Sequence, residues 1–335
     1  MGSESLILVI FVIITALIFE YINGFHDSAN AIATVVSTKV LSPKYAVIYA
    51  GILNFFGALA GTHVAKTIGS GIVLKDAVDQ YVIICALAGA IIWNLITWYY
   101  GLPSSSSHAL IGGLLGAAIA KAGGGVVNLN GLNTKVLIPM FTSPVIGLII
   151  GFLFMLLLLW LFFKSNPEIM NKHFKKLQLI SSGIMAFSHG SNDAQKTMGI
   201  VTLSLFSFGA IETFNVPLWV ILLCAFVMGL GTMSGGWRII RTMGSKVIKL
   251  KPIHGFAAET SAAGVILAAS HFGIPLSTTH IISSAIMGVG STSNPSAVKW
   301  GIVGNIVKTW VFTIPVCMLI SGVLYFILSV IFNIL

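Results

Sequence analysis

The chain has 335 residues, of which 56% are hydrophobic and only 8% are charged, and its mean hydropathy is +0.99. Because soluble domains carry about 25% charged residues, this composition excludes a water-soluble fold and predicts an all-α, polytopic membrane protein. The formal net charge of +9 comes from Lys and Arg gathered in short loops, which is typical of membrane proteins. No basic region is large enough to predict a nucleic-acid partner.

Apolar segments follow one another along the whole chain. The first, at 5–22, lacks the basic start of a cleaved signal peptide and is expected to be a transmembrane helix. A span needs about 20 residues, and several segments are shorter or longer, so we expect about 10–12 transmembrane segments with broken helices and re-entrant hairpins. The expected segments cover 5–22, 25–38, 45–65, 81–100, 106–122, 138–163, 178–205, 215–237, 254–271, 278–290 and 297–334.

Two polar motifs each occur twice within this apolar sequence. Tyr21-Ile-Asn-Gly-Phe-His-Asp-Ser-Ala-Asn30 resembles Phe187-Ser-His-Gly-Ser-Asn-Asp-Ala-Gln-Lys196, and Gly101-Leu-Pro-Ser-Ser-Ser-Ser-His108 resembles Gly273-Ile-Pro-Leu-Ser-Thr-Thr-His280. Two weaker matches, near Lys66 and Arg241 and near Pro144 and Pro315, keep the same order at a similar offset. Ordered matches at a near-constant offset predict two homologous halves, 1–163 and 178–335, joined by a basic linker at 164–177.

Loop charge predicts how the two halves are oriented. The loop near 39–44 carries two lysines, whereas its equivalent at 206–216 has no Lys or Arg. The next pair reverses this, because 66–80 mixes both signs and 238–251 is strongly basic. Equivalent loops are therefore expected on opposite sides of the membrane, which defines an inverted repeat. The basic loops and linker would be cytoplasmic, with both termini outside the plasma (inner) membrane.

The first repeated motif indicates a cation site. Carboxylate, amide and carbonyl oxygens suit a hard cation such as Na⁺, and glycine permits unwound backbone that exposes carbonyls. The alternative is that these small and polar residues only pack helices together. The predicted ligands are Asn23, Asp27, Asn30, Asn192 and Asp193.

The second repeated motif indicates an anion site. A proline followed by hydroxyl residues is typical of a helix start, where free N–H groups and the helix dipole attract anions. Ordinary helix caps are the alternative. The predicted ligands are Ser104, Ser105, Ser106, Ser107, Ser277, Thr278 and Thr279. An oxyanion beside two carboxylates is repelled by both, so the two sites together predict coupled binding of an anion with cations, although protonated aspartates would also relieve the repulsion.

Two further charged residues are candidates for coupling. Lys196 stands where the first motif has Asn30, and it could contact the anion, pair with Asp193 or extend toward the membrane surface. Glu259 lies in an apolar run, where a carboxylate is either functional or a helix-end residue. The chain has no Gly-x-Ser-x-Gly motif, so an intramembrane hydrolase is disfavoured. No enzyme activity and no cofactor is predicted.

The chain resembles the inorganic phosphate transporter (Pit-type) family. The resemblance rests on Gly24-Phe-His-Asp-Ser-Ala-Asn-Ala31, on His189-Gly-Ser-Asn-Asp193, and on the Pro-Ser/Thr-rich motifs that end in His108 and His280. It implies inverted repeats, hairpin half-helices, phosphate held between the halves, sodium-dependent symport, and a homodimer in membrane lipid. The chain departs from the family pattern at His26 and at Gln195-Lys196, where the family commonly has Asn and a small residue followed by Asn.

These observations predict a cation-coupled, sodium-driven symporter that imports inorganic phosphate by alternating access. The alternative is a proton-coupled phosphate or sulfate permease, since some relatives resemble sulfate permeases. An ion channel is a further alternative, although a symmetric selectivity ring would suit it better than two hairpins.

Overall fold

The computed structural model describes residues 6–74, 77–292 and 294–332, and these are almost entirely helical. Within these ranges the strand content is a single isolated bridge between Val73 and Val127. The predicted all-α fold is confirmed. Among the described residues, four helices are long and apolar enough to cross a membrane, or up to six spans if each bent helix pair counts as one. This is fewer than the 10–12 expected, because some helices are short and others, such as α8, are rich in polar residues.

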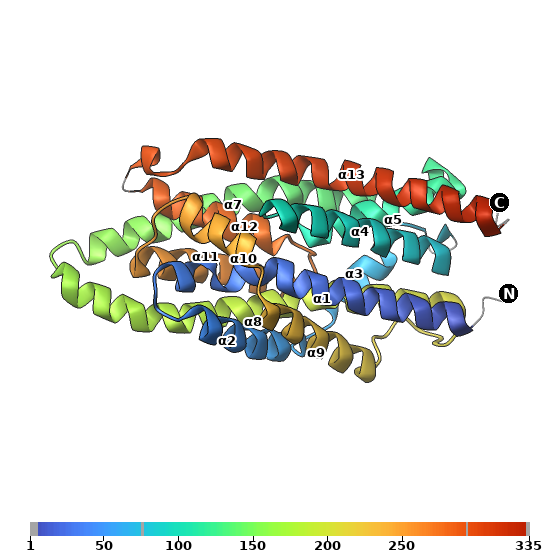
Figure 1. Cartoon of the computed structure of the whole chain (residues 1–335), viewed down its shortest axis with the longest axis horizontal. Helices are drawn as coiled ribbons and strands as arrows, with labels where there is room; N and C mark the ends of the chain where they lie inside the picture. Colours follow the sequence, from blue (N-terminus) through green and yellow to red (C-terminus); the bar gives the residue numbers. More distant parts are fainter. Residues whose placement is uncertain (1–5, 75–76, 293, 333–335) are drawn as a thin grey trace.

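The helices are described as two series that follow the two predicted halves (Figure 1). The first series consists of α1 (Leu6–Ser37), α2 (Pro43–Ala58), α3 (His63–Ser70), α4 (Gln80–Tyr100), α5 (Ser106–Ala122) and α7 (Ile138–Leu161). The second consists of α8 (Pro167–Phe208), α9 (Leu218–Ser234), α10 (Trp237–Arg241), α11 (Pro252–His271), α12 (Thr278–Ser291) and α13 (Trp300–Phe332). Short pieces connect them: η2 (Gly124–Val126), α6 (Leu129–Leu132), η3 (Asn133–Leu137), η4 (Thr242–Lys246) and η5 (Pro295–Ala297).

Helices are broken at equivalent places in the two series. The α2 and α3 axes differ by 75°, and the axis of α9 differs by 58° from that of the combined α10 and η4. The first break lies inside the predicted segment 45–65, and the second follows the end of α9 at Gly235, which has a φ of 73°. A positive φ is accessible to glycine at little cost, so Gly235 can end the helix sharply.

The motif helices α1 and α8 remain helical through their glycines, contrary to the predicted unwinding. A Cβ on Gly24 would lie 2.6 Å from the Met228 carbonyl oxygen of α9, and a Cβ on Gly190 would lie 2.2 Å from the Asn54 carbonyl oxygen of α2. Glycine is therefore required because another helix backbone passes over it, as at close helix crossings in membranes. The predicted segment break at 22–25 is wrong for the same reason.

Helices of one series pack against helices of the other. From the first part of each series, α1 packs on α9 and α2 packs on α8. From the last part of each series, α5 packs on α13 and α7 packs on α12. Most of the predicted linker is also helical, since α8 begins at Pro167. Helices of the two predicted halves thus interlock, and the halves are not separate packing units.

The long helices run in opposite directions in the two series (Figure 1). α1 and α7 run toward the turn between α7 and α8, whereas α8 and α13 run away from it. Both termini lie at the end of the molecule opposite that turn.

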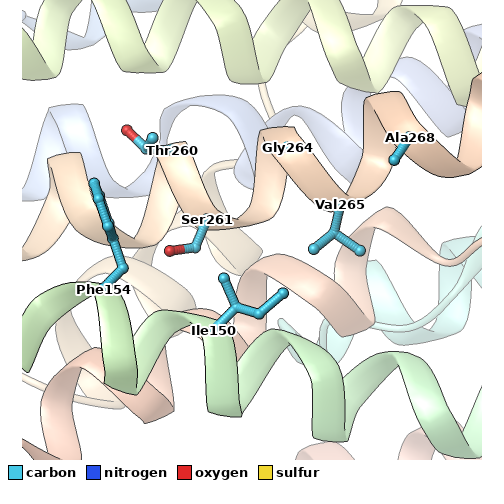
Figure 2. A pocket seen from close by; sticks show the side chains of 7 residues that line it. All are labelled: Ile150, Phe154, Thr260, Ser261, Gly264, Val265 and Ala268. Carbon is cyan, nitrogen blue, oxygen red and sulfur yellow. The ribbon is translucent and has the colours of Figure 1, made fainter.

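An apolar groove of about 400 Å³ opens on the surface between α7 and α11 (Figure 2). Ile150 of α7 faces Val265 of α11, and Phe154 of α7 lies near Thr260 and Ser261. Gly264 and Ala268 of α11 complete the lining. The groove contains none of the repeated motif residues. The candidate site must therefore be sought in the buried polar interior.

Candidate functional site

The two repeated aspartates meet where α1 and α8 cross. Ligand atoms of Asp27, His189 and Asp193 all lie within 4.8 Å of one another. Asp27 is 2% exposed and Asp193 is 1% exposed. Two unit negative charges at this separation repel each other by about 3 kcal/mol at an effective dielectric constant of 20. The cluster therefore requires positive charge, which a side chain, a proton or a bound cation can supply.

Asp27 is held by a hydrogen-bonded chain that reaches the first hairpin. His26 Nδ1 lies 2.7 Å from Asp27 Oδ1, and His26 Nε2 lies 3.0 Å from Thr97 Oγ1 at the end of α4. Ser104 Oγ lies 2.9 Å from the same Thr97 hydroxyl and 3.3 Å from His26 Nε2. His26 thus fixes the carboxylate and links it to the start of the loop that leads into α5.

Asp193 has a different environment because a lysine lies beside it. Lys196 Nζ donates to Asp193 Oδ1 at 2.5 Å, and His189 Nε2 lies 3.3 Å from Asp193 Oδ2. The Thr278 hydroxyl donates to Asp193 Oδ2 at 3.1 Å. Of the three roles considered for Lys196 in the sequence, pairing with Asp193 is the one that the structure shows.

Each motif helix also contacts the start of a hairpin helix from the opposite series. Asn30 Nδ2 on α1 donates to Thr278 Oγ1 at 3.2 Å and to Thr279 Oγ1 at 2.9 Å, at the start of α12. Lys196 Nζ on α8 donates to Ser107 Oγ at the start of α5. The motif predicted for the cation site and the motif predicted for the anion site are therefore in direct hydrogen-bond contact.

The hairpin helices begin as the sequence predicts, but their hydroxyls have different partners. Ser105 Oγ accepts from the His108 N–H at 3.2 Å, and Ser277 Oγ accepts from the His280 N–H at 3.3 Å, so both are N-caps. Ser106 Oγ is buried and has no partner among the described atoms. The first-turn N–H groups of both helices point toward the cluster end and carry the positive end of the helix dipole.

The predicted asparagines on the cation side differ in how closely they approach the cluster. Asn192 donates to Ser270 Oγ at 2.9 Å and to the Ile274 carbonyl at 3.5 Å, which fixes it against the loop before α12. Its Oδ1, like that of Asn23, is buried and has no partner among the described atoms. Buried oxygens without a donor are costly, and a bound cation would satisfy them.

Glu259 lies in a separate polar cluster. It accepts hydrogen bonds from Thr34 and Ser181, and from Gln178 Nε2 at 3.2 Å. Thr34 is seven residues beyond Asp27 on α1, or about 10 Å along the helix axis. The structure therefore does not bring Glu259 into contact with the aspartate cluster.

Glu20 is a buried acidic residue that was not among those predicted from the sequence. This residue is fully buried in α1 and accepts a hydrogen bond from Thr197 on α8, one residue after Lys196. The signal was present, because a carboxylate in the apolar segment 5–22 is a functional candidate by default. Glu20 lies just before the repeated motif and has no acidic equivalent in the second half, so the repeat does not single it out.

Comparisons with known proteins agree with these features. The model of the phosphate transporter family matches residues 23–321. A probable low-affinity inorganic phosphate transporter of Rhizobium meliloti (strain 1021) is 49% identical over 95% of this chain and 96% of its own length. One of the same description from Bacillus subtilis (strain 168) is 46% identical over 98% of this chain and 99% of its own.

A solved structure agrees as well. The chain superposes on a structure titled "The sodium-dependent phosphate transporter" with a TM-score of 0.90 and 27% identity, over 97% of this chain and 100% of that one. This multi-pass membrane protein is a transporter and not an enzyme, and the chain belongs to the phosphate transporter family.

Proposed function

We propose that this chain is a cation-coupled symporter that imports inorganic phosphate with sodium by alternating access. The observation that carries the proposal is the meeting of Asp27 and Asp193, from opposite halves, beside the starts of the two hairpin helices. Lys196 offsets only one of the two carboxylates, so anionic phosphate beside them still needs added positive charge. Cations supplied from solution would provide it, and their binding would then favour phosphate binding, which is the basis of symport.

In this proposal Asp27, Asp193 and the amides of Asn23, Asn30 and Asn192 form the cation side. The hairpin starts, with Ser104 to Ser107 and Ser277 to Thr279, form the phosphate side. Ser106 is the most direct phosphate ligand, because its buried hydroxyl has no partner among the described atoms. Ser105 and Ser277 act through the N–H groups that they position as caps.

Alternating access would move one set of helices against the other around this cluster. The opposite directions of α1 and α8, and of α7 and α13, support an inverted repeat with both termini on one side. We propose that the termini lie outside the plasma (inner) membrane and the basic loops and linker in the cytoplasm. We also expect a homodimer in lipid.

The test is uptake of radiolabelled phosphate into proteoliposomes under an inward Na⁺ gradient, beside an inward H⁺ gradient and with excess sulfate. We expect concentrative uptake that needs Na⁺, is not competed by sulfate, and is lost in Asp27→Asn and Asp193→Asn. Folding of both variants is checked by size-exclusion chromatography and thermal unfolding.

Other outcomes would contradict the proposal in distinct ways. Uptake driven by an H⁺ gradient alone would support the proton-coupled permease, and competition by sulfate would overturn phosphate selectivity. Linear uptake that does not saturate and never exceeds the external concentration would support a channel.

A further inference from the structure

Lys196 and Asn30 occupy equivalent positions in the two motifs, and both reach equivalent places in the structure. Each lies three residues after the motif aspartate on its long helix. Each side chain crosses to the start of the opposite hairpin helix, Asn30 to Thr279 and Lys196 to Ser107. The two positions therefore correspond to each other. The first half has an amide group there, on Asn30, and the second half has an ammonium group, on Lys196.

The ammonium group of Lys196 is surrounded by oxygen atoms. It donates to Asp193 Oδ1 at 2.5 Å, to the Leu276 carbonyl at 3.0 Å, and to Ser107 Oγ. The side chain is 2% exposed. A lysine ammonium has three N–H donors, so these three acceptors satisfy it completely. A carboxylate, a carbonyl and a hydroxyl are also the oxygen ligands that a hard cation would take.

The equivalent position in the first half has no such positive charge. Asp27, Asn30 and Thr279 surround it, with the Thr279 hydroxyl 3.5 Å from Asp27 Oδ1. Histidines do not account for the difference, because His26 contacts Asp27 and His189 contacts Asp193. Asn30 uses its amide nitrogen on the two threonines, and its carbonyl oxygen thus remains for a cation.

We propose that Lys196 is a tethered cation that permanently fills the second-half cation position. Asp193 then stays on the cation side as the partner of this ammonium group. The protein binds one transported cation, at Asp27, where a chain with asparagine at position 196 would bind two. Asp27, Asp193 and Lys196 taken together carry one net negative charge, which one Na⁺ would neutralise. This inference rests on the proposed function, because it sets the number of cations in the same symport cycle.

The number of sodium ions tests this directly in the wild-type protein. In proteoliposomes, dual-label uptake of ²²Na⁺ and radiolabelled phosphate gives the number of ions per phosphate. We expect one. In purified full-length protein, the Na⁺ dependence of thermal stabilisation at saturating phosphate gives an independent readout, expected to be non-cooperative. Two sodium ions per phosphate in the wild-type protein would overturn the proposal without any variant.

Lys196→Asn should create a second cation site beside Asp193. We expect two sodium ions per phosphate and cooperative stabilisation by Na⁺, with Lys196→Gln as a second variant that also supplies an amide oxygen. Lys196→Met removes the charge without supplying a ligand, and should bind phosphate more weakly at every Na⁺ concentration. Lys308→Asn, on the exposed face of α13, is the matched control for loss of a lysine and should behave as wild type.

The outcomes separate this inference from the function on which it rests. Wild-type protein that takes up phosphate without any need for Na⁺ would overturn sodium symport itself. Sodium-driven uptake with an unchanged ion count in well-folded Lys196→Asn and Lys196→Gln would leave symport intact and overturn only the tethered cation.

Discussion

Asn30 and Thr279 join the two halves of the protein through a hydrogen bond of 2.9 Å between Asn30 Nδ2 and Thr279 Oγ1. The two residues are 249 positions apart in the chain, and both are almost fully buried. The same amide also donates to Thr278, whose hydroxyl donates in turn to Asp193. One asparagine therefore connects the first motif helix, the second hairpin and the second aspartate.

Asn30→Ala should weaken sodium binding more than it weakens folding. The substitution removes two hydrogen bonds and the amide oxygen that we assign to the cation. The groups left unpaired should lower the free energy of unfolding by about 1–3 kcal/mol. We expect the Na⁺ concentration for half-maximal phosphate uptake to rise about tenfold. Asn305→Ala, at an exposed position on α13, is the control. An unchanged Na⁺ dependence in folded Asn30→Ala would remove Asn30 from the cation site.

Ser277→Asp separates helix capping from phosphate binding. Aspartate caps a helix as well as serine does, so the stability of α12 should be kept, whereas Ser277→Ala should cost about 1 kcal/mol. The added negative charge beside the anion should raise the KM for phosphate strongly, by tenfold or more for about 1.4 kcal/mol of repulsion. Thermal unfolding and phosphate uptake measure the two effects. If Ser277→Asp transports with a normal KM, the hairpin start is a structural cap and not a phosphate site.

Gly24→Ala and Gly190→Ala should destabilise the protein because each added Cβ meets a backbone carbonyl of a crossing helix. The cost of such overpacking is about 1–3 kcal/mol for each variant. Gly264→Ala is the matched control, since a Cβ there meets nothing within 4 Å and alanine favours a helix. Thermal unfolding in detergent compares the three. Equal stability of Gly190→Ala and Gly264→Ala would show that α2 and α8 can move apart at little cost.

Glu259→Ala should lower stability and leave phosphate affinity unchanged. The substitution removes an acceptor used by Thr34, Gln178 and Ser181, and buried donors without partners cost about 1–3 kcal/mol each. The separation of about 10 Å along α1 keeps this cluster out of contact with the aspartates. Phosphate binding at saturating Na⁺ measures the affinity. A large loss of phosphate affinity in folded Glu259→Ala would instead place Glu259 in the binding site.

The sequence predicted most helix bounds near the hairpins because the signals there are local. A proline and a capping hydroxyl define the start of α5 at Ser106 and of α12 at Thr278 within a few residues. The membrane class followed from composition alone. Glycine was misread at Gly24 and Gly190, because the same residue permits both an unwound turn and a close helix crossing. Only the position of the neighbouring helix distinguishes the two.

The sequence by itself determined that this is a helical membrane protein, and it predicted two related halves and several of the polar residues that lie together in the structure. These features depend on composition and on spacing along the chain. Only the tertiary structure decided which helices of the two halves pack together. It also decided that Glu259 lies apart from the aspartates and that Lys196 contacts Asp193 and Ser107. Lys196 and Ser107 are 89 residues apart, and local propensity carries no information about a contact at that separation. Such contacts form only when helices from both halves pack together, because packing decides which buried charged groups lie next to each other.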